Sequence, residues 1–196
     1  TNDFLVFDVG KPCPDYLPAH AHADLLSYEL YVDGQPMVVD SGVYEYAAGA
    51  WRDYFRSTRA HNTLEVQGQN QSEVWDSFRV ARRAQPQRVS WRQEQGVFIA
   101  QAEHDGYQRL DVPVVHRRTV IACPDSFWIF IDELTGRGST KAATFVHLHP
   151  RLSFRSANPA DWQILGADGP LWVSACGHGS ETIVCGQRRP ELQGWY

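Results

Sequence analysis

The sequence predicts an all-β protein: a large antiparallel β-sandwich with at most one or two short helical turns. Three observations indicate this class. Apolar and polar residues alternate with a period of two in many short segments, which is the pattern of half-buried strands. Turn-forming Gly, Pro, Asn and Asp residues separate these segments. No convincing apolar stripe with the helical period extends beyond a few turns, and strands without intervening helices favour a sandwich over a parallel sheet.

The clearest element is a β-hairpin within LSYELYVDGQPMVVD. The apolar residues of its first strand share one face, and Asp33-Gly34 is a typical two-residue turn. The N-terminal TNDFLVFDVG is also strand-like, and WRDYFRSTRA can form one or two helical turns. The further predicted strands, in chain order, span residues 62–67, 74–82, 87–93, 96–103, 114–121, 126–133, 141–148, 161–165, 171–175 and 181–185.

Composition limits the classes of function. The 196 residues, 43% of them hydrophobic, suffice for one domain with a real core, which we place at residues 1–196. A formal charge of −5 gives no electrostatic case for nucleic acid or an anionic membrane. No apolar run approaches the roughly 20 residues needed to span a bilayer. No signal peptide is visible, and the abrupt, strand-like start is typical of a piece of a longer protein.

The first candidate site lies in LPAHAHADLLSYELYVDGQPMVVDSG. In an extended chain His20 and His22 point to the same side, and with Asp24 they offer the nitrogen and carboxylate ligands that zinc binds. A third ligand must come from elsewhere, and Asp40 and His61 are the natural candidates. The alternative interpretation is a hydrogen-bonded histidine pair in a loop that holds no metal.

The geometry of the hairpin limits this ligand set. Beyond its tight turn, Asp40 pairs opposite Ser27, so about 16 Å would separate it from His22 if both strands ran straight. A shared metal therefore requires the chain before the first hairpin strand to bend back. Otherwise Asp24 or Glu29 takes the place of Asp40.

The second candidate site is YEYAAGAWRDYFRSTRAHNT, residues 44–63. Guanidinium groups suit carboxylates and sulfates, and tyrosines offer both a stacking face and a hydroxyl, so this mixture fits recognition of an acidic sugar. The alternative is a solvated loop whose arginines pair with Asp53 and Glu45. The residues that carry the sugar-binding hypothesis are Tyr44, Tyr46, Arg52, Tyr54 and Arg56.

Other polar residues are predicted to be structural. His147 and His149 alternate in a strand-like run and favour a sheet-face role, while Asp132 and Glu133 are expected to solvate a turn. The isolated histidines, His104, His116 and His178, are interpreted as structural too. Cys176 and Cys185 could meet across a hairpin, which leaves the cellular compartment open. The motifs of serine hydrolases, phosphate-binding loops and zincins are absent from the sequence.

The two candidate sites together carry a family resemblance. HAHADLLSYELYVDGQPMVVDSGVYEY, followed by WRDYFRSTRAHNTLEVQGQNQSEVW and FRVARRA, resembles the C-terminal domain of the heparinase II/III-like polysaccharide lyases. The match is strongest over residues 17–83. It rests on the ordered set H-x-H, D-S-G-x-Y, R-x-Y-x-R-S-T and A-H-N-T. In that family an N-terminal (α/α) toroid precedes a β-sandwich, and the cleft between them cleaves acidic polysaccharides by β-elimination.

The resemblance also implies roles for individual residues. His20 would be the contribution of the sandwich to the catalytic cleft, and His22, Asp40 and His61 would hold one zinc ion that organises the loops beside it. Residues that would contact substrate or support these ligands are Tyr44, Arg52, Tyr54 and Arg56. Because the toroid and its catalytic residues are missing here, we expect the chain alone to be inactive or nearly so. A periplasmic or secreted location is favoured for the parent protein.

Two further functions compete with this interpretation. A stand-alone sandwich could hold acidic glycans through arginine and aromatic residues without catalysis. A cupin-type metal enzyme also carries an early H-x-H. Here, however, six residues separate His22 from Glu29, longer than the usual cupin gap, and A-H-N-T lacks the glycine and proline context of the second cupin motif.

Overall fold

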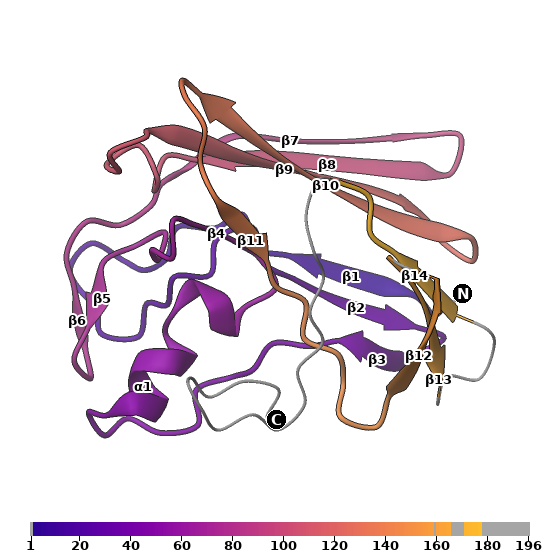
Figure 1. The fold of residues 1–196 in the computed structure, drawn as a ribbon, viewed down its shortest axis with the longest axis horizontal. Coiled ribbons are helices and arrows are strands. Elements are labelled where there is room, and N and C mark those ends of the chain that lie inside the picture. The colour runs from indigo at the N-terminus through magenta and orange to yellow at the C-terminus, as the bar shows by residue number, and fades with distance from the viewer. Residues whose placement is uncertain (1, 159, 166–170, 178–196) are drawn as a thin grey trace.

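A computed structural model describes residues 2–158, 160–165 and 171–177, and two antiparallel sheets packed face to face form its centre (Figure 1). The first sheet has the order β1-β2-β3 and the second β10-β9-β8-β7. The strands of the first sheet are β1 (Phe4–Phe7), β2 (Tyr28–Val32) and β3 (Gln35–Val38). Those of the second are β7 (Pro86–Glu94), β8 (Val97–His104), β9 (Val114–Cys123) and β10 (Phe127–Gly136). The predicted all-β sandwich is therefore confirmed.

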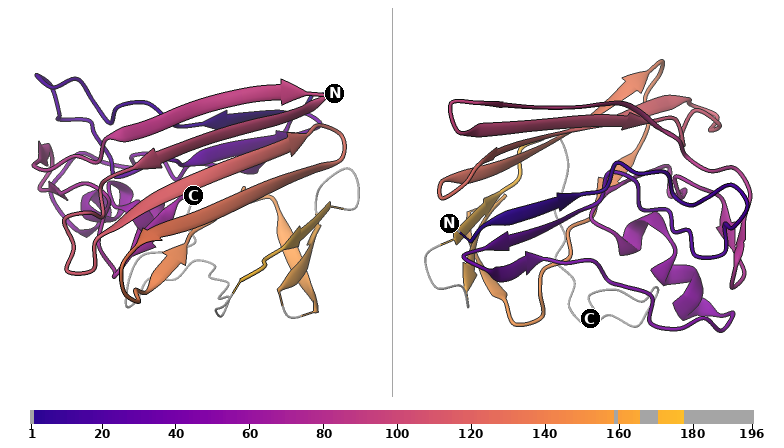
Figure 2. Two further views of the ribbon diagram at one scale, coloured as in Figure 1. Left: turned by 90° about the horizontal axis from the view of Figure 1, so that it is seen from above. Right: turned by 180° about the vertical axis from the view of Figure 1, so that it is seen from behind.

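Smaller elements flank the sandwich at its two ends. Helix α1 (Ala50–Phe55) and the 3-10 turn Thr58–Ala60 provide the short helical turns that the sequence predicted. The remaining strands are β4 (Leu64–Val66), β5 (Val74–Trp75), β6 (Arg79–Val80), β11 (Ala142–Thr144), β12 (Ser153–Asn158), β13 (Asp161–Leu165) and β14 (Leu171–Ser174). The small sheet β12-β13-β14 lies at the end opposite α1 (Figures 1 and 2).

Two strand predictions need correction, and a third is not tested. The segment 74–82 is not one strand but the hairpin of β5 and β6, which turns at Asp76 with a positive φ of 54°. The strand expected over 141–148 ends at Thr144, and β12 was not predicted. The predicted strand 181–185, and with it Cys185, lies outside the described residues. The other boundaries agree within a few residues, because their period-two patterns are long.

The core between the two sheets is aromatic. Tyr28 of β2 stacks on Phe130 of β10 with ring centroids 3.9 Å apart, and Trp128 packs beside them. Along β10 these inward side chains alternate with the exposed Ile129 and Ile131. This alternation continues through the next residue of the strand, so residue 132 points inward although it is an aspartate.

Asp132 therefore contradicts the prediction that it solvates a turn. It lies within β10, its side chain is only 15% exposed, and Arg118 of β9 holds both carboxylate oxygens at 2.7 Å. Arg118 itself is fully buried. The sequence pattern could not show this, because an ion pair directed into a core has the same alternation as one directed to solvent.

A chain of hydrogen bonds joins two buried histidines to this ion pair. The Gly106 amide donates to Nδ1 of His104 (3.2 Å), which leaves the His104 Nε2–H to donate to Nδ1 of His116 (3.1 Å). The Nε2–H of His116 then donates to Asp132 (2.8 Å). A Cβ atom at Gly106 would lie 2.5 Å from the Gln71 carbonyl oxygen, so glycine is required there. Both histidines are structural, as predicted.

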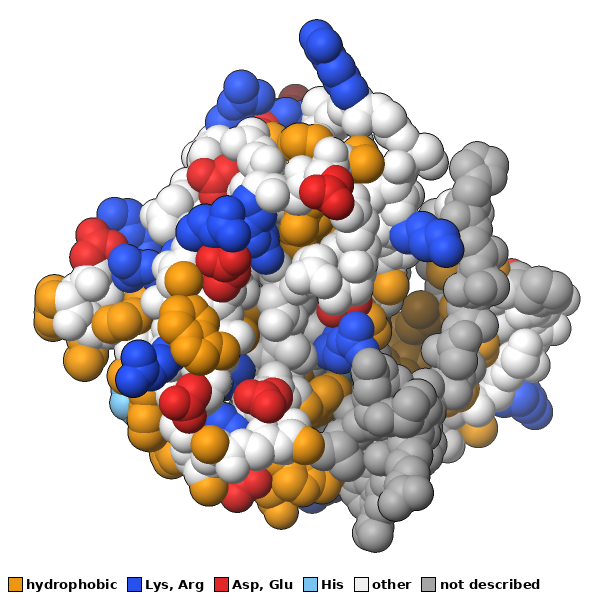
Figure 3. Space-filling model, turned by 60° about the vertical axis from the view of Figure 1, so that its left-hand side comes forward, with side chains coloured by type: hydrophobic (Ala, Val, Ile, Leu, Met, Phe, Trp, Pro, Cys, Tyr) orange, Lys and Arg blue, Asp and Glu red, His pale blue; other side chains and the backbone are white. Residues whose placement is uncertain are grey.

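On the face shown in Figure 3, neither basic nor acidic side chains form a patch of one charge; both are interspersed with apolar side chains. Exposed pairs such as Arg82–Glu73, with 2.6 Å between nitrogen and oxygen, contribute to this mixture. Within the described residues, no helix has the length and apolar character needed to cross a membrane.

We predict that acid destabilises the fold through His104 and His116. Burial lowers the pKa of both, so both stay neutral in the folded protein, whereas the unfolded chain protonates them near pH 6.5. The unfolded state then binds more protons, and the free energy of unfolding falls as pH drops below 6.5, by up to about 1.4 kcal/mol per pH unit for each histidine.

Urea unfolding at several pH values measures this slope. His104→Gln keeps a donor toward His116 but removes one titrating group, so its slope below pH 6.5 should be shallower than that of the wild type. His20→Gln, at an exposed position, controls for the loss of a histidine. Equal slopes for wild type and His104→Gln would contradict the proposed contribution of His104 to acid destabilisation.

Candidate metal centre

The chain bends sharply just before β2, as a shared metal site requires. The Ser27 amide donates to the Asp24 carbonyl at 2.9 Å, and Leu26 adopts a left-handed φ of 62° in this turn. Glycine is the usual residue in such a position, because a side chain makes this conformation unfavourable. Leu26 is held there by complete burial of its side chain and by donation of its amide to the Asp8 carbonyl. The bend carries His22 back toward the hairpin.

The second segment of the site follows α1. Arg56, at the end of the helix, is 1% exposed and donates to the Ala21 carbonyl at 3.1–3.2 Å and to the Asp76 carbonyl at 2.8 Å. The Ala23 amide donates in turn to the Arg56 carbonyl. Helix α1 is thus fastened to the loop that carries His22, and the 3-10 turn that follows leads directly to His61.

These two segments bring three potential ligands together. Ligand atoms of His22, Asp24 and His61 all lie within 4.8 Å of one another. Nδ1 of His61 contacts a carboxylate oxygen of Asp40 at 2.6 Å, and its Nε2 is buried with no hydrogen-bond partner among the described residues. A histidine held by a carboxylate at one ring nitrogen and left open at the other is typical of metal sites. The structure therefore brings Asp24 into the group and places Asp40 beside it.

The electrostatics of this cluster favour a cation. Burial raises the pKa of Asp24, and burial lowers that of His22 to about 3, so this imidazole is neutral and free to bind a metal. Burial opposes a charge on His61 and on Asp40, but their mutual hydrogen bond outweighs it, raising the pKa of His61 and lowering that of Asp40. A cation bound among these residues would favour the ionised form of Asp24, which burial otherwise opposes.

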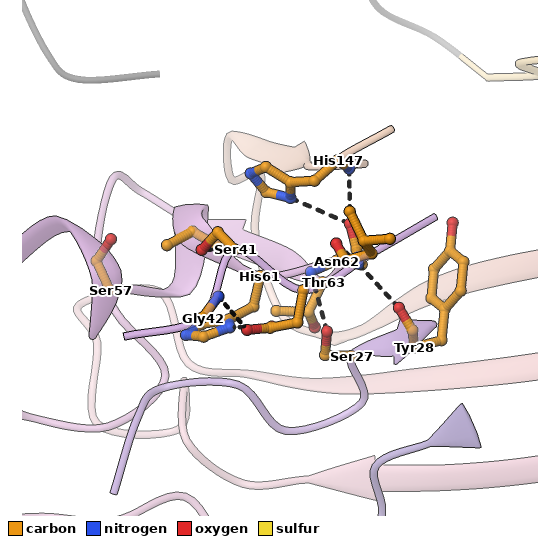
Figure 4. Close-up of polar contacts among 12 residues, drawn as sticks. Ser27, Tyr28, Ser41, Gly42, Ser57, His61, Asn62, Thr63 and His147 are labelled. Atoms are coloured by element: carbon orange, nitrogen blue, oxygen red, sulfur yellow. Dashed lines mark hydrogen bonds and ion pairs between the residues drawn. The ribbon is translucent and has the colours of Figure 1, made fainter. Parts of the chain in front are cut away.

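Asn62, next to His61, joins three segments of the chain (Figure 4). Its Nδ2 donates to the carbonyls of Tyr28 (2.8 Å) and Val39 (2.9 Å), and its Oδ1 accepts from the His147 amide (2.7 Å). All three contacts are with backbone groups, two beside the β2–β3 hairpin and one in the segment after β11. The side chain of Asn62 therefore fixes the position of His61 relative to the first sheet.

His147 lies closer to this centre than its predicted sheet-face role implied. Its carbonyl does pair with Val39, in the manner of a strand, but its Nδ1 lies 3.1 Å from the Asn62 side chain. Burial, followed by the charge of His61, lowers the pKa of His147 to about 4. The alternating H-x-H pattern marked His147 as a residue of interest. Nothing in that pattern indicated a contact with Asn62, which lies 85 residues earlier in the chain.

The predicted cleft residues gather around Arg52. The guanidinium carbon lies 5.2 Å from the Tyr46 ring centroid and 5.7 Å from that of Phe78, and Nε donates to the Ser77 carbonyl. His20 is exposed and meets the same two rings edge-on, at 5.7 and 6.2 Å. Both Nη atoms of Arg52 are buried without a hydrogen-bond acceptor among the described residues. An anionic group is the natural complement of such a guanidinium.

The remaining predicted site residues are placed differently. Tyr44 is 70% exposed and stacks on Phe55 at 5.6 Å, as a substrate contact requires. Tyr54 and Arg56 are buried and support the site, so contact of either with a substrate stays a prediction. Glu29 lies in β2 and does not belong to the cluster of ligand atoms among the described residues.

A family model and two sequence relatives point to the same family. The model of the family "Heparinase II/III-like, C-terminal" matches residues 2–193. A heparin-sulfate lyase of Bacteroides stercoris is 27% identical over 132 residues, which are 65% of this chain and 17% of that protein. A heparin-sulfate lyase of Pedobacter heparinus is 25% identical over 124 residues, 61% of this chain and 17% of its own length. The chain thus matches less than a fifth of the length of these relatives.

Solved structures share the fold. The heparan sulfate lyase HepC of Pedobacter heparinus, in a mutant form, superposes with a TM-score of 0.68 at 19% identity, covering 89% of this chain and 26% of that one. A heparinase III structure superposes with a TM-score of 0.59 at 20% identity, covering 83% and 25%. At these identities the likeness concerns the fold alone.

We predict that Asn62→Ala strongly destabilises the protein. Three backbone groups lose their hydrogen-bond partner in this variant, and each costs on the order of 1 kcal/mol or more when left unpaired, for a total of about 3 kcal/mol. Chemical denaturation provides the measurement. Asn70→Ala is the matched control, because the Asn70 side chain accepts one bond, from the Thr58 amide, and should cost about a third as much. Equal losses in the two variants would contradict the role of Asn62.

Proposed function

The chain belongs to the heparinase II/III-like family through its C-terminal domain, and on this premise we propose that it is the sandwich domain of a polysaccharide lyase. The proposed parent enzyme cleaves an acidic, uronate-containing polysaccharide by β-elimination. The proposed role of this domain is to hold one zinc ion and to form part of the substrate cleft. The observation that carries the zinc proposal is the cluster of His22, Asp24 and His61 with Asp40 against the His61 ring.

The donor set of this cluster fits zinc. Two imidazoles and a carboxylate are a common protein ligand set for Zn²⁺, with a fourth position left for another group. His22 and His61 would be ligands, and either Asp24 or Asp40 would complete the protein set. If Asp24 binds the metal, Asp40 orients His61 through the 2.6 Å contact. Bound zinc would supply a cross-link between the segment around His22 and the segment around His61.

Substrate recognition is assigned to the surface around Arg52. Arg52 is fully buried, so a carboxylate or sulfate of the polysaccharide would reach its unpaired Nη groups only when the adjoining Tyr46 and Phe78 rings move aside. Tyr44 and Tyr46 already offer exposed rings on which sugars can stack. Neutralising the uronate carboxylate makes the neighbouring C–H more acidic, which is the main demand of β-elimination. The proposed role of His20, which is exposed beside Tyr46, is to contact the reacting sugar and to take part in proton transfer.

The chain alone is proposed to be inactive. The part of it that aligns with the two lyase relatives covers 17% of the length of each. The family resemblance assigns the remaining catalytic residues to an N-terminal toroid. A second candidate function, a glycan-binding module without catalysis, rests on the same unpaired Arg52 and is separated from the first by turnover in the longer parent protein.

We predict that the purified chain retains about one zinc per molecule after dialysis against metal-free buffer. His61→Ala should lose the metal, because this variant removes both a ligand and the partner of Asp40. His149→Ala, at a histidine outside the cluster, is the control. Elemental analysis measures the zinc content of the wild type and of the two variants. Wild-type protein without metal would contradict the zinc site.

The same measurement on Asp24→Asn and Asp40→Asn identifies the carboxylate ligand. A direct ligand should be needed for stoichiometric binding, whereas loss of an orienting carboxylate should weaken affinity by about 10- to 100-fold. Zinc titration against a chromophoric chelator gives both affinities. Equal, wild-type affinity in both variants would exclude a role for either aspartate.

We further predict that the chain binds heparan sulfate oligosaccharides without converting them. Arg52→Met should weaken binding about tenfold, because it removes the charge-assisted hydrogen bonds to the anionic group. Arg155→Met, at an exposed arginine of β12 at the far end of the molecule, is the control (Figure 1). Calorimetry measures binding, and ultraviolet absorbance detects the unsaturated product. Product formation by the chain alone would overturn the claim that it is inactive.

A further inference from the structure

Arg118 connects the second sheet to both segments of the metal centre. It belongs to β9, yet its Nη1 donates to the Leu26 carbonyl at 2.7 Å and to the Asn62 carbonyl at 2.5 Å. Leu26 is the left-handed residue of the turn two positions after Asp24. Asn62 directly follows His61. One guanidinium nitrogen therefore holds together two chain segments that each carry candidate ligands.

The other two guanidinium nitrogens of Arg118 are held by Asp132. Nε and Nη2 of Arg118 donate to the two carboxylate oxygens of Asp132, each at 2.7 Å. Asp132 also accepts from His116 at 2.8 Å and from the Thr144 hydroxyl at 3.1 Å. Arg118 is 0% exposed, and its carbon Cζ lies 5.3 Å from the Tyr28 ring centroid. A planar group held at two edges has little freedom to rotate, so the direction of Nη1 is set by Asp132.

The loop that carries His22 and Asp24 is thus anchored on both sides. Arg56 binds the carbonyl of Ala21, just before His22, and Arg118 binds the carbonyl of Leu26, just after Asp24. Without the second anchor, the strained Leu26 turn would keep the hydrogen bonds from the Leu26 amide to the Asp8 carbonyl, from the Thr63 hydroxyl to the Leu25 carbonyl and from the Asn62 amide to the Ser27 hydroxyl. It would lose its charged link to β9. The separation between Asp24 and His61 would then be fixed less rigidly, because the link from both segments to β9 would be lost.

We propose that Arg118 and Asp132 are positioning residues for the metal centre, which set the distance between the His22–Asp24 loop and His61. The proposal rests on the proposed zinc site, because positioning is measured through the metal. A purely structural ion pair would act on the stability of the fold and leave the metal geometry of the folded protein unchanged.

The test compares Arg118→Met with Arg117→Met in the full chain. Arg117 is the neighbouring residue on β9, but it points away from the core and pairs with Glu103 at 2.6 Å. Circular dichroism first establishes that each variant is folded. Zinc affinity is then measured by chelator competition, and the visible absorption spectrum of bound Co²⁺ reports the geometry of the ligands.

In folded Arg118→Met we expect zinc affinity to fall about 10- to 100-fold and the Co²⁺ spectrum to change, while Arg117→Met stays within about twofold of wild type. Wild-type affinity and spectrum in Arg118→Met would overturn the proposal. If this variant does not fold, Arg118→Lys and Asp132→Asn are judged by the same two outcomes. Lysine keeps the charge but cannot hold Asp132 and both carbonyls together.

Failure of the proposed function gives a different result. In that case the wild-type chain binds neither zinc nor Co²⁺, and hydrogen exchange decides the role of Arg118. Faster exchange at residues 22–27 and 58–63 in Arg118→Lys, but not in Arg117→Met, would support positioning of the two segments. Unchanged exchange in both variants would overturn it.

Discussion

The ion pair of Arg118 and Asp132 is the contact on which the arrangement of this domain depends. Buried ion pairs often contribute little to stability, because removing two charges from water costs about as much as their attraction returns. Here the pair directs the free edge of the guanidinium toward the carbonyls of Leu26 and Asn62 in the opposite layer. It thereby connects the second sheet to the irregular segments that precede β2 and β4, which have no ladder of their own to hold them.

Irregular chain at a functional site needs partners for its backbone groups, and in this protein side chains supply them. Arg56, Arg118 and Asn62 use their polar atoms mainly on main-chain groups. The exceptions are the link of Arg118 to Asp132 and the contact of Asn62 with the His147 ring. The result is a loop that can bend through a left-handed leucine and still keep its carbonyls paired. Exposed residues such as His20 and Tyr44 are then left free for a ligand.

Much of the architecture could be predicted because period-two patterns and the Asp33-Gly34 turn are local signals. His61 was one of two natural candidates for a further ligand beside His22, and the family resemblance completed the set, since no local pattern relates residues so far apart. Asp24 was named as a candidate ligand, but the choice among Asp24, Glu29 and Asp40 could not be derived, because the bend at Leu26 occurs without the glycine that usually marks it. Asp132 was misjudged for a related reason: alternation gives the face of a residue but not which face is the core.

The distribution of the site along the chain has a consequence for folding. The candidate ligands all lie within the first 61 residues, but the contacts of Arg118 with Asn62 and Leu26 span 56 and 92 residues of sequence. Contacts of such long range form late, because the intervening loop must close first. During synthesis the ligands therefore emerge well before the strand that orders them. Under the proposed zinc site, the Arg118 contacts with both ligand-bearing segments are complete only once the sandwich has closed, so a bound ion would stabilise the finished fold.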